Sequence, residues 1–192
     1  MNGFLISIGF LVILAVVFAV AQYNKLIRFD NYAKTAWSNI DNQLDAKARI
    51  LTNVIQVLEM GYEKEKEFIN SAIMARQGLQ EGSVEEKAKA NETVQKDLLP
   101  KMSLLMEAYP ESKTSESLSD AIEKITQCED KITYARTAFN KSVENFNILI
   151  KQFPTVIFAN TFGYNQPKTR FEITEEKRES YGHMSVNDIR KG

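Results

Sequence analysis

Residues 118–153 read LSDAIEKITQCEDKITYARTAFNKSVENFNILIKQF, and this stretch decides the fold. Apolar side chains recur in it at every seventh position, namely Leu118, Ile125, Ile132, Phe139, Phe146 and Phe153. Such a repeat places the side chains along one face of an α-helix, as in coiled coils and helical bundles. The stretch therefore predicts a long helix with one buried face, which ends at Pro154 because a residue before proline disfavours helix.

The same period runs through the N-terminal half of the chain. One register contains Leu26, Ala33, Ile40, Val54, Phe68 and Ala75, and another contains Trp37, Leu44, Leu51, Leu58 and Ala72. Lys47, Gly61 and Glu65 are the poor core residues of this pattern. Since no proline interrupts it, we expect one unbroken helix that reaches about Gln77. We expect Trp37 to pack against the third helix, rather than to anchor at the membrane, because it occupies the apolar stripe.

Turn and capping signals predict a second helix between these two. The stretch Gly78 to Gly82 indicates a turn, and Ser83 followed by Glu86 has the capping-box pattern that starts a helix. Pro100 predicts a bend or break, and the pair Tyr109-Pro110 predicts the end of this helix. Few glycines and prolines are available for further turns, with 8 and 4 in the chain. The pattern predicts an all-α antiparallel bundle of long, coiled-coil-like helices.

An apolar stretch precedes the bundle. Residues 4–21, FLISIGFLVILAVVFAVA, are about long enough to cross a bilayer core as a helix. Tyr23, Lys25 and Arg28 follow, and an aromatic residue followed by basic residues is typical of the cytoplasmic membrane interface. We expect a single transmembrane helix, continuous with the bundle, in a cell membrane. Its N-terminus should lie outside and the helical domain in the cytoplasm.

These observations predict an organisation in three parts. Residues 1–24 form the transmembrane anchor, 25–173 the helical bundle and 174–192 a charged, disordered tail. The apolar segment 155–164 should pack back onto the bundle or into another subunit. A cleaved secretory signal is the alternative for the N-terminal segment, because 19–21 (AVA) suits signal peptidase, although no basic residue precedes the apolar run.

The composition excludes several functional classes. The 192 residues carry 24 basic and 25 acidic side chains, so bulk charge does not favour nucleic-acid binding. Cys128 is the only cysteine and His183 the only histidine, which argues against disulfides and against zinc or di-iron sites. No phosphate-binding loop or nucleophile motif occurs. We therefore predict no catalytic residue, metal, cofactor or small-molecule substrate, and no enzyme.

Polar side chains break the apolar registers at a few positions. The candidate site residues are Lys47, Glu65, Glu129, Arg136 and Asn140, with Asn147 one heptad beyond Asn140. Glu129 and Arg136 could form a buried ion pair, or could contact Lys47 and Glu65 on the first helix. Buried polar groups in bundles most often specify helix alignment, which is the interpretation we favour. A ligand or partner site is the alternative.

Short motifs spread over nearly the whole chain carry a resemblance to a known family. They are YNKL (23–26), AWSNIDNQL (36–44), EAYP (107–110), EDKI (129–132), Ala135-Arg136, Phe139-Asn140, Asn147, Phe153-Pro154 and Phe171-Glu172. In these residues and their order the chain resembles the LemA family, which implies a bacterial, membrane-anchored helical protein and no defined activity. The chain departs from the family at 45–54, DAKARILTNV, where a basic pair and a proline are usual.

The architecture favours a role in binding rather than catalysis. A long amphipathic bundle continuous with its anchor presents a large side surface. We therefore predict a non-enzymatic membrane-anchored scaffold that self-associates as a homo-oligomer or docks a protein partner, with the lipid bilayer as its other partner. The alternative is a sensor or adaptor that relays an envelope or membrane stress signal to a cytoplasmic protein.

Overall fold

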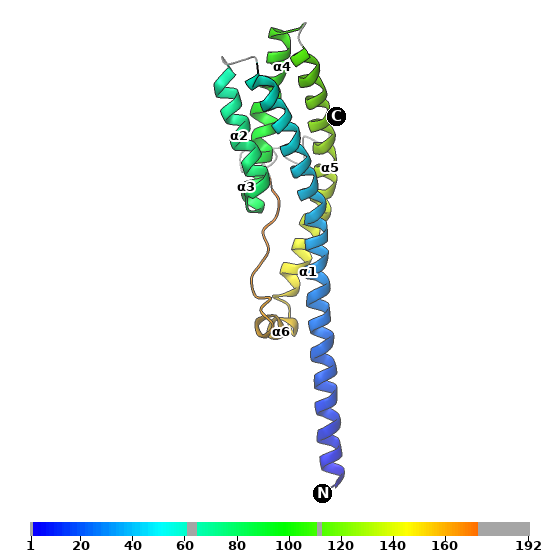
Figure 1. Cartoon of the computed structure of the whole chain (residues 1–192). Coiled ribbons are helices and arrows are strands. Elements are labelled where there is room, and N and C mark those ends of the chain that lie inside the picture. The colour runs from blue at the N-terminus through cyan, green and yellow to red at the C-terminus, as the bar shows by residue number, and fades with distance from the viewer. Residues whose placement is uncertain (1, 61–64, 111–112, 173–192) are drawn as a thin grey trace, which may run out of the picture. The chain divides into compact units, whose positions relative to one another are not determined.

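The computed structural model describes residues 2–60, 65–110 and 113–172. Its elements are α1 (Asn2–Glu59), α2 (Lys66–Glu81), α3 (Val84–Thr93), the π-helix η2 (Val94–Leu98), α4 (Leu99–Ala108), α5 (Lys113–Leu149) and α6 (Thr155–Thr161). No strand occurs among the described residues, so the predicted all-α class is confirmed (Figure 1). The predicted tail at 174–192 lies outside them.

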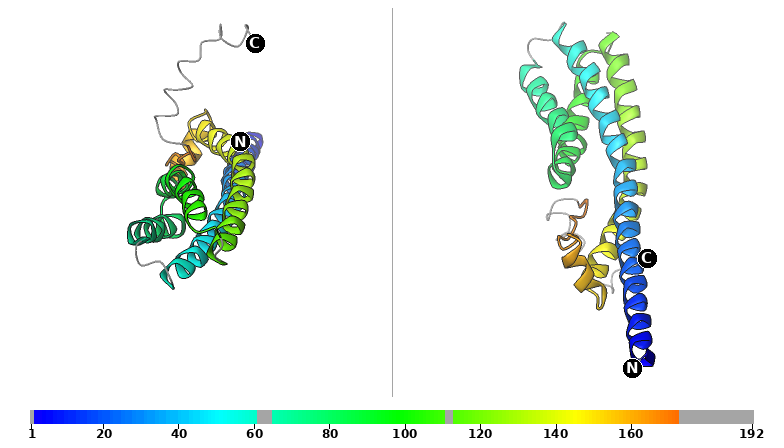
Figure 2. Two further views of the ribbon diagram at one scale, coloured as in Figure 1. Left: turned by 90° about the horizontal axis from the view of Figure 1, so that it is seen from above. Right: turned by 60° about the horizontal axis from the view of Figure 1, so that its bottom comes forward.

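Two compact units divide the chain, and α1 and α5 pass through both. The first unit combines Met1–Ser38 with Thr137–Thr169, and the second combines Asn39–Arg136 with Arg170–Gly192. In each unit α1 and α5 lie side by side and run in opposite directions, as Figures 1 and 2 show. The predicted boundaries at residues 24 and 173 stay predictions.

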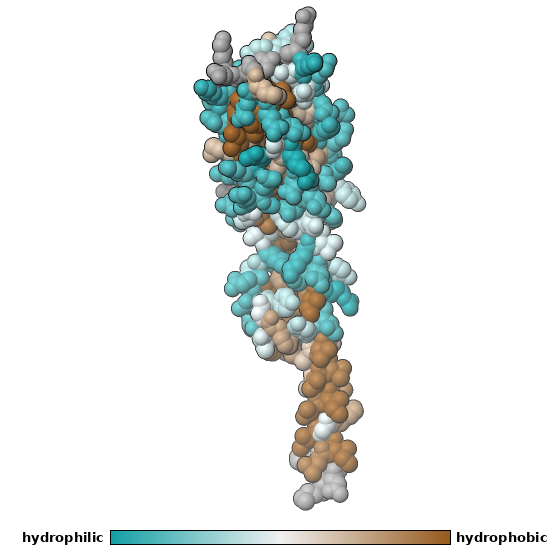
Figure 3. Space-filling view, viewed as in Figure 1, coloured by the Kyte–Doolittle hydropathy of each residue, from teal (hydrophilic) through white to brown (hydrophobic). Residues whose placement is uncertain are grey.

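The N-terminal part of α1 is an apolar helix that the described part of the chain leaves largely exposed. Its large apolar side chains from Leu5 to Val20 are 43% to 72% exposed. Figure 3 shows them as one continuous hydrophobic stretch. Within the part of the chain that the structure describes, α1 is the one helix that is long and apolar enough to cross a membrane, by length and composition.

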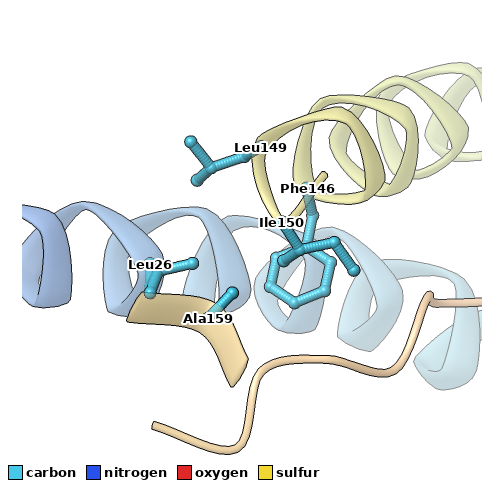
Figure 4. Packing of buried hydrophobic residues seen from close by; sticks show 5 residues of the cluster. All are labelled: Leu26, Phe146, Leu149, Ile150 and Ala159. Atoms are coloured by element: carbon cyan, nitrogen blue, oxygen red, sulfur yellow. The ribbon is translucent and has the colours of Figure 1, made fainter. Parts of the chain in front are cut away.

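The core of the first unit forms where α1, α5 and α6 meet. It contains Leu26, Phe146, Leu149, Ile150 and Ala159 (Figure 4). Because α6 supplies Ala159, the prediction that the apolar segment after Pro154 packs back onto the bundle is confirmed. Trp37 packs against Phe139 of α5, with ring centroids 5.2 Å apart, so its predicted position is also confirmed.

The core of the second unit follows the predicted apolar registers. Its buried residues include Ile40, Leu44, Leu51, Val54 and Leu58 on α1 and Leu118, Ile125 and Ile132 on α5. The helices α2 and α3 form an antiparallel pair that approaches closely at Gly78. A Cβ atom at Gly78 would lie 2.8 Å from Cβ of Ala90, so glycine permits this approach.

The predicted end of the first helix is wrong. The first helix ends at Glu59 rather than near Gln77, and α2 is a separate helix. The heptad count missed this end because the apolar period continues on α2, where Phe68, Ala72 and Ala75 are buried. Gly61 in the sequence was the available signal, since glycine is common just after helix ends.

The turn after α2 is shorter than predicted, because α2 continues through Glu81. The predicted capping box at the start of α3 is confirmed. The backbone N–H of Ser83 donates to Glu86 Oε2 at 2.8 Å, and the N–H of Glu86 donates to Ser83 Oγ at 3.3 Å. These reciprocal bonds satisfy helix donors that would otherwise lack partners.

The chain is not interrupted at Pro100, because α3, η2 and α4 follow one another without a gap, but a π-turn lies directly before this proline. Pro100 lies in the first turn of α4, directly after η2. Its ring removes a backbone donor, so the regular α-helical ladder cannot run through this point. The N–H of Leu99 instead reaches back to the carbonyl of Val94. The helix α4 then ends at Ala108, as predicted.

The last member of the third-helix stripe is not in the core. Helix α5 ends at Leu149, before the predicted end at Pro154, and Phe153 is 76% exposed. The seven-residue repeat does not bury Phe153, because the helix has already ended at Leu149. The peptide bond between Phe153 and Pro154 is cis.

Candidate functional site

A cluster of four polar side chains, here called the polar cluster, lies inside the second unit. Lys47 of α1 has its Nζ 2.5 Å from Glu129 Oε2 of α5 and donates to Asn91 Oδ1 of α3 at 2.7 Å. Asn91 Nδ2 and Gln95 Nε2 also donate to Glu129 Oε2, each at 3.1 Å. One carboxylate oxygen of Glu129 on α5 therefore accepts hydrogen bonds from side chains of α1, α3 and η2.

The polar cluster holds two charges with little access to water. The Lys47 side chain is fully buried, and 26% of the Glu129 side chain is exposed. Burial lowers the pKa of Lys47, because the opposing effect of Glu129 is smaller. Burial alone would raise the pKa of Glu129. The Lys47 ammonium and the hydrogen bonds outweigh that effect and hold the Glu129 pKa below its usual value.

The helices position these side chains by their periodicity. Lys47 occupies the register of Ile40 and Val54, so the seven-residue repeat turns it into the core. The wider turn of η2 holds one more residue than an α-helical turn. It places Val94 in the core while Gln95, next in the chain, reaches the Glu129 carboxylate.

The structure brings together some of the predicted site residues but not all of them. Lys47 and Glu129 form the ion pair, rather than Glu129 and Arg136. Arg136 is half-buried on α5 and contributes through its charge, which lowers the pKa of Glu129. Glu65 lies just before α2, outside the polar cluster. Asn140 is half-buried on the part of α5 that belongs to the first unit.

Asn91 and Gln95 were not among the predicted site residues. A signal for Asn91 existed, because it shares a seven-residue register with Val84, Leu98 and Leu105 and is the polar break in that series. Gln95 had no comparable signal, since its position depends on the π-turn.

A second polar group lies in the first unit and was also missed. Asp30 is buried, and its carboxylate lies 2.7 Å from Lys168 Nζ and 2.8 Å from Lys34 Nζ. Burial alone would raise the pKa of Asp30, but the hydrogen bonds from the two lysines lower it below its usual value. Asn147 exchanges two hydrogen bonds with the backbone of Lys168, at 2.9 and 2.8 Å. Asn147 therefore holds the segment after α6, and its predicted role in helix alignment stays a prediction.

The predicted interface residues follow the apolar part of α1. Lys25 and Arg28 are exposed on α1. The ring of Tyr23 packs against Phe162, with ring centroids 4.9 Å apart. This places an aromatic pair directly beyond the apolar run.

The chemistry of the polar cluster suits a structural role. A lysine with a lowered pKa can act as a nucleophile in other proteins, but it must meet a substrate. Lys47 is fully buried in the core, and its ammonium group donates hydrogen bonds to Glu129 and Asn91. Burial raises the pKa of the neighbouring Cys128 thiol, which disfavours the reactive thiolate. Among the described residues, no group of three or more potential metal ligands occurs.

A groove between α1 and α5 of the second unit, here called the α1–α5 groove, has a volume of about 490 Å³. Apolar residues of its lining include Val54, Leu118, Ala121 and Cys128, which are buried. Exposed charged residues of its lining are Arg49, Asp120, Lys124 and Lys131. An apolar floor with a charged rim has the character of a surface for an amphipathic helix.

Comparison with known protein families gives a match over most of the chain. The family model described as the LemA family matches residues 36–182, which begin in the AWSNIDNQL motif and include the residues of the polar cluster. A search of curated proteins finds no match.

Proposed function

The chain belongs to the LemA family, and on that premise we propose that it is a membrane-anchored helical scaffold that self-associates. The family is not known as an enzyme family, and its membership specifies no activity. The proposal therefore depends on which surfaces the protein presents to other molecules.

One observation supports the proposed anchoring in a membrane. Helix α1 is unbroken from Asn2 to Glu59, and its first part is apolar and exposed while its later part supplies core residues to both units. An apolar helix of this length is stable when a bilayer surrounds it and unfavourable in water. The anchor and the bundle then share one continuous helix.

The α1–α5 groove supports self-association. Its apolar floor offers area to an amphipathic helix, and its rim carries three basic side chains, Arg49, Lys124 and Lys131, against Asp120. The whole chain has a net charge of -1, so two copies do not repel one another strongly. We propose an acidic helical face of a second copy as the occupant of the groove.

The mass of the full-length protein in mild detergent tests this proposal. We expect the parent chain to have the mass of several copies, measured by light scattering after gel filtration. The double variant Lys124→Glu with Lys131→Glu should shift it toward a single copy. The matched control is Lys101→Glu with Lys113→Glu, which changes two exposed lysines outside the groove and gives the same net charge. The control should keep the parent mass.

Other outcomes decide between the proposals. A single-copy mass for the parent chain contradicts self-association. A monomer that retains a stoichiometric cytoplasmic protein in a pull-down supports the alternative, a sensor or adaptor that relays a membrane signal. If both double variants dissociate equally, net charge rather than the groove governs assembly, and the groove assignment fails.

A further inference from the structure

Helix α6 has a buried face and an exposed apolar face in the first unit. Thr155 and Ala159 are buried, and Ala159 belongs to the core cluster shown in Figure 4. Ile157 is 55% exposed, and the flanking Phe153 and Phe162 are 76% and 40% exposed. Large apolar side chains that gather on one exposed segment mark a surface that meets a partner or a membrane.

Three contacts set the position of α6 along α1. They are Phe158 with Phe18 (ring centroids 5.9 Å apart), Phe162 with Tyr23 (ring centroids 4.9 Å apart) and the hydrogen bond from Thr155 Oγ1 to Gln22 Oε1 at 2.9 Å. All three partners on α1 lie between residues 18 and 23, where the apolar run ends. If residues 4–21 span a bilayer, α6 lies at the level of the interface.

The charges near α6 favour an anionic surface. In residues 22–31 and 148–164, which the structure describes completely, the basic residues are Lys25, Arg28 and Lys151, and all three are exposed. The one acidic residue in these ranges is Asp30, which is buried and bound by lysines. Clustered exposed cations attract anionic headgroups.

We propose that α6, with Phe153 and Phe162, lies in the interfacial layer of an anionic bilayer beside the membrane-spanning part of α1. This inference rests on the membrane anchoring proposed above. The exposed apolar side chains meet the boundary between headgroups and acyl chains, and the exposed cations meet the phosphates. A second contact of this kind fixes the depth of α1, because a spanning helix alone can slide and tilt.

Single-tryptophan variants of the full-length chain measure this depth. Trp37→Phe removes the natural tryptophan, and Ile157→Trp, Tyr32→Trp or Phe10→Trp then supplies the probe. Each variant is reconstituted into liposomes of phosphatidylethanolamine and phosphatidylglycerol with brominated acyl chains, which quench a tryptophan that touches them. Tyr32 is the matched control, because it is 57% exposed in the same unit but lies about 16 Å beyond Ala21 along α1.

We expect quenching at positions 157 and 10 and none at position 32. Quenching at position 10 without quenching at 157 overturns this inference and leaves the anchoring intact. No quenching at position 10 contradicts the anchoring itself. Quenching at 157 should weaken in brominated phosphatidylcholine alone, and equal quenching there contradicts the anionic preference. If the Trp37→Phe background loses its helical circular dichroism, the probes are placed in the parent chain and its own quenching is subtracted.

Discussion

Lys47 carries a charge into the mainly apolar core of the second unit. Its ammonium lies 2.5 Å from the Glu129 carboxylate, and the two residues come from helices far apart in the sequence. A buried ion pair adds little net stability, but a shifted helix would separate the two charges inside the core. The pair therefore favours one alignment of α1 against α5.

A double-mutant cycle on Lys47 and Glu129 tests this role. Lys47→Met or Glu129→Leu alone leaves one buried charge without its partner and should cost roughly 3 to 5 kcal/mol of unfolding free energy. The double variant should cost clearly less than the sum, although Asn91 and Gln95 also lose an acceptor. The measurement is urea unfolding of the detergent-solubilised protein, followed by circular dichroism.

Arg136→Leu is the control for this cycle. Arg136 is half-buried and outside the ion pair, so its replacement should cost much less than Lys47→Met. If the Lys47 and Glu129 variants each cost only a few tenths of a kcal/mol, the pair is solvated and the alignment role is wrong.

Acid should destabilise the protein through Glu129 and Asp30. Both carboxyl groups have a pKa lowered by basic partners in the folded state, so the unfolded chain binds more protons as the pH falls. Their stabilisation is complete above the usual carboxyl pKa, roughly pH 4, and is lost as the pH falls through the folded pKa values. Urea midpoints across this range should fall less steeply for Glu129→Gln than for the parent chain. Asp130→Asn, at the exposed neighbouring carboxylate, should keep the parent slope, and equal slopes for all three proteins contradict the prediction.

The polar cluster could be predicted from the sequence only in part. Lys47 and Glu129 stand out because they break apolar registers, and Asn91 breaks one in the same way. Gln95 could not be found, because heptad counting assumes a regular helix and η2 is not regular. Asp30 and Lys168 could not be paired either, since Lys168 belongs to a segment without periodicity.

For the helices, periodicity predicted which faces are buried better than where each helix ends. The stripe on α5 is buried from Leu118 to Phe146. The end of α1 at Glu59 could not be predicted from the repeat. The antiparallel helix α2 packs against the same core, so its buried residues continue the seven-residue spacing. Capping signals were more informative about boundaries, as the bonds between Ser83 and Glu86 illustrate.

Three phenylalanines at heptad spacing on and after α5 provide a graded test of burial. Phe139→Ala and Phe146→Ala each remove a buried ring and should cost roughly 3 to 5 kcal/mol. Phe153→Ala is the matched control and should cost little, because its ring is exposed. Thermal unfolding followed by circular dichroism gives the ranking, and an equal loss for all three would contradict the end of α5 at Leu149.

The residues that flank the apolar run predict the orientation of the protein in the membrane. Lys25, Arg28 and Lys34 follow the run, and no charged side chain precedes it. Basic residues remain preferentially on the cytoplasmic side of a span. The bundle should therefore face the cytoplasm.

A reporter fusion measures this orientation in intact cells. An alkaline phosphatase that folds only after export, fused to the C-terminus, should be inactive. A β-galactosidase fused at the same position should be active. This activity is the control that the cells produce the fusion protein. The opposite pattern would place the helical domain outside the membrane.

The π-helix η2 also bears on how related chains align. Because a π-turn holds one more residue than an α-turn, the stretch Val94–Leu98 amounts to a one-residue insertion in a continuous helix. A relative with a one-residue gap at this point should have a regular helix there and no amide in the place of Gln95. Relatives with this gap should also differ at the position of Glu129. We expect there a side chain that accepts one hydrogen bond fewer.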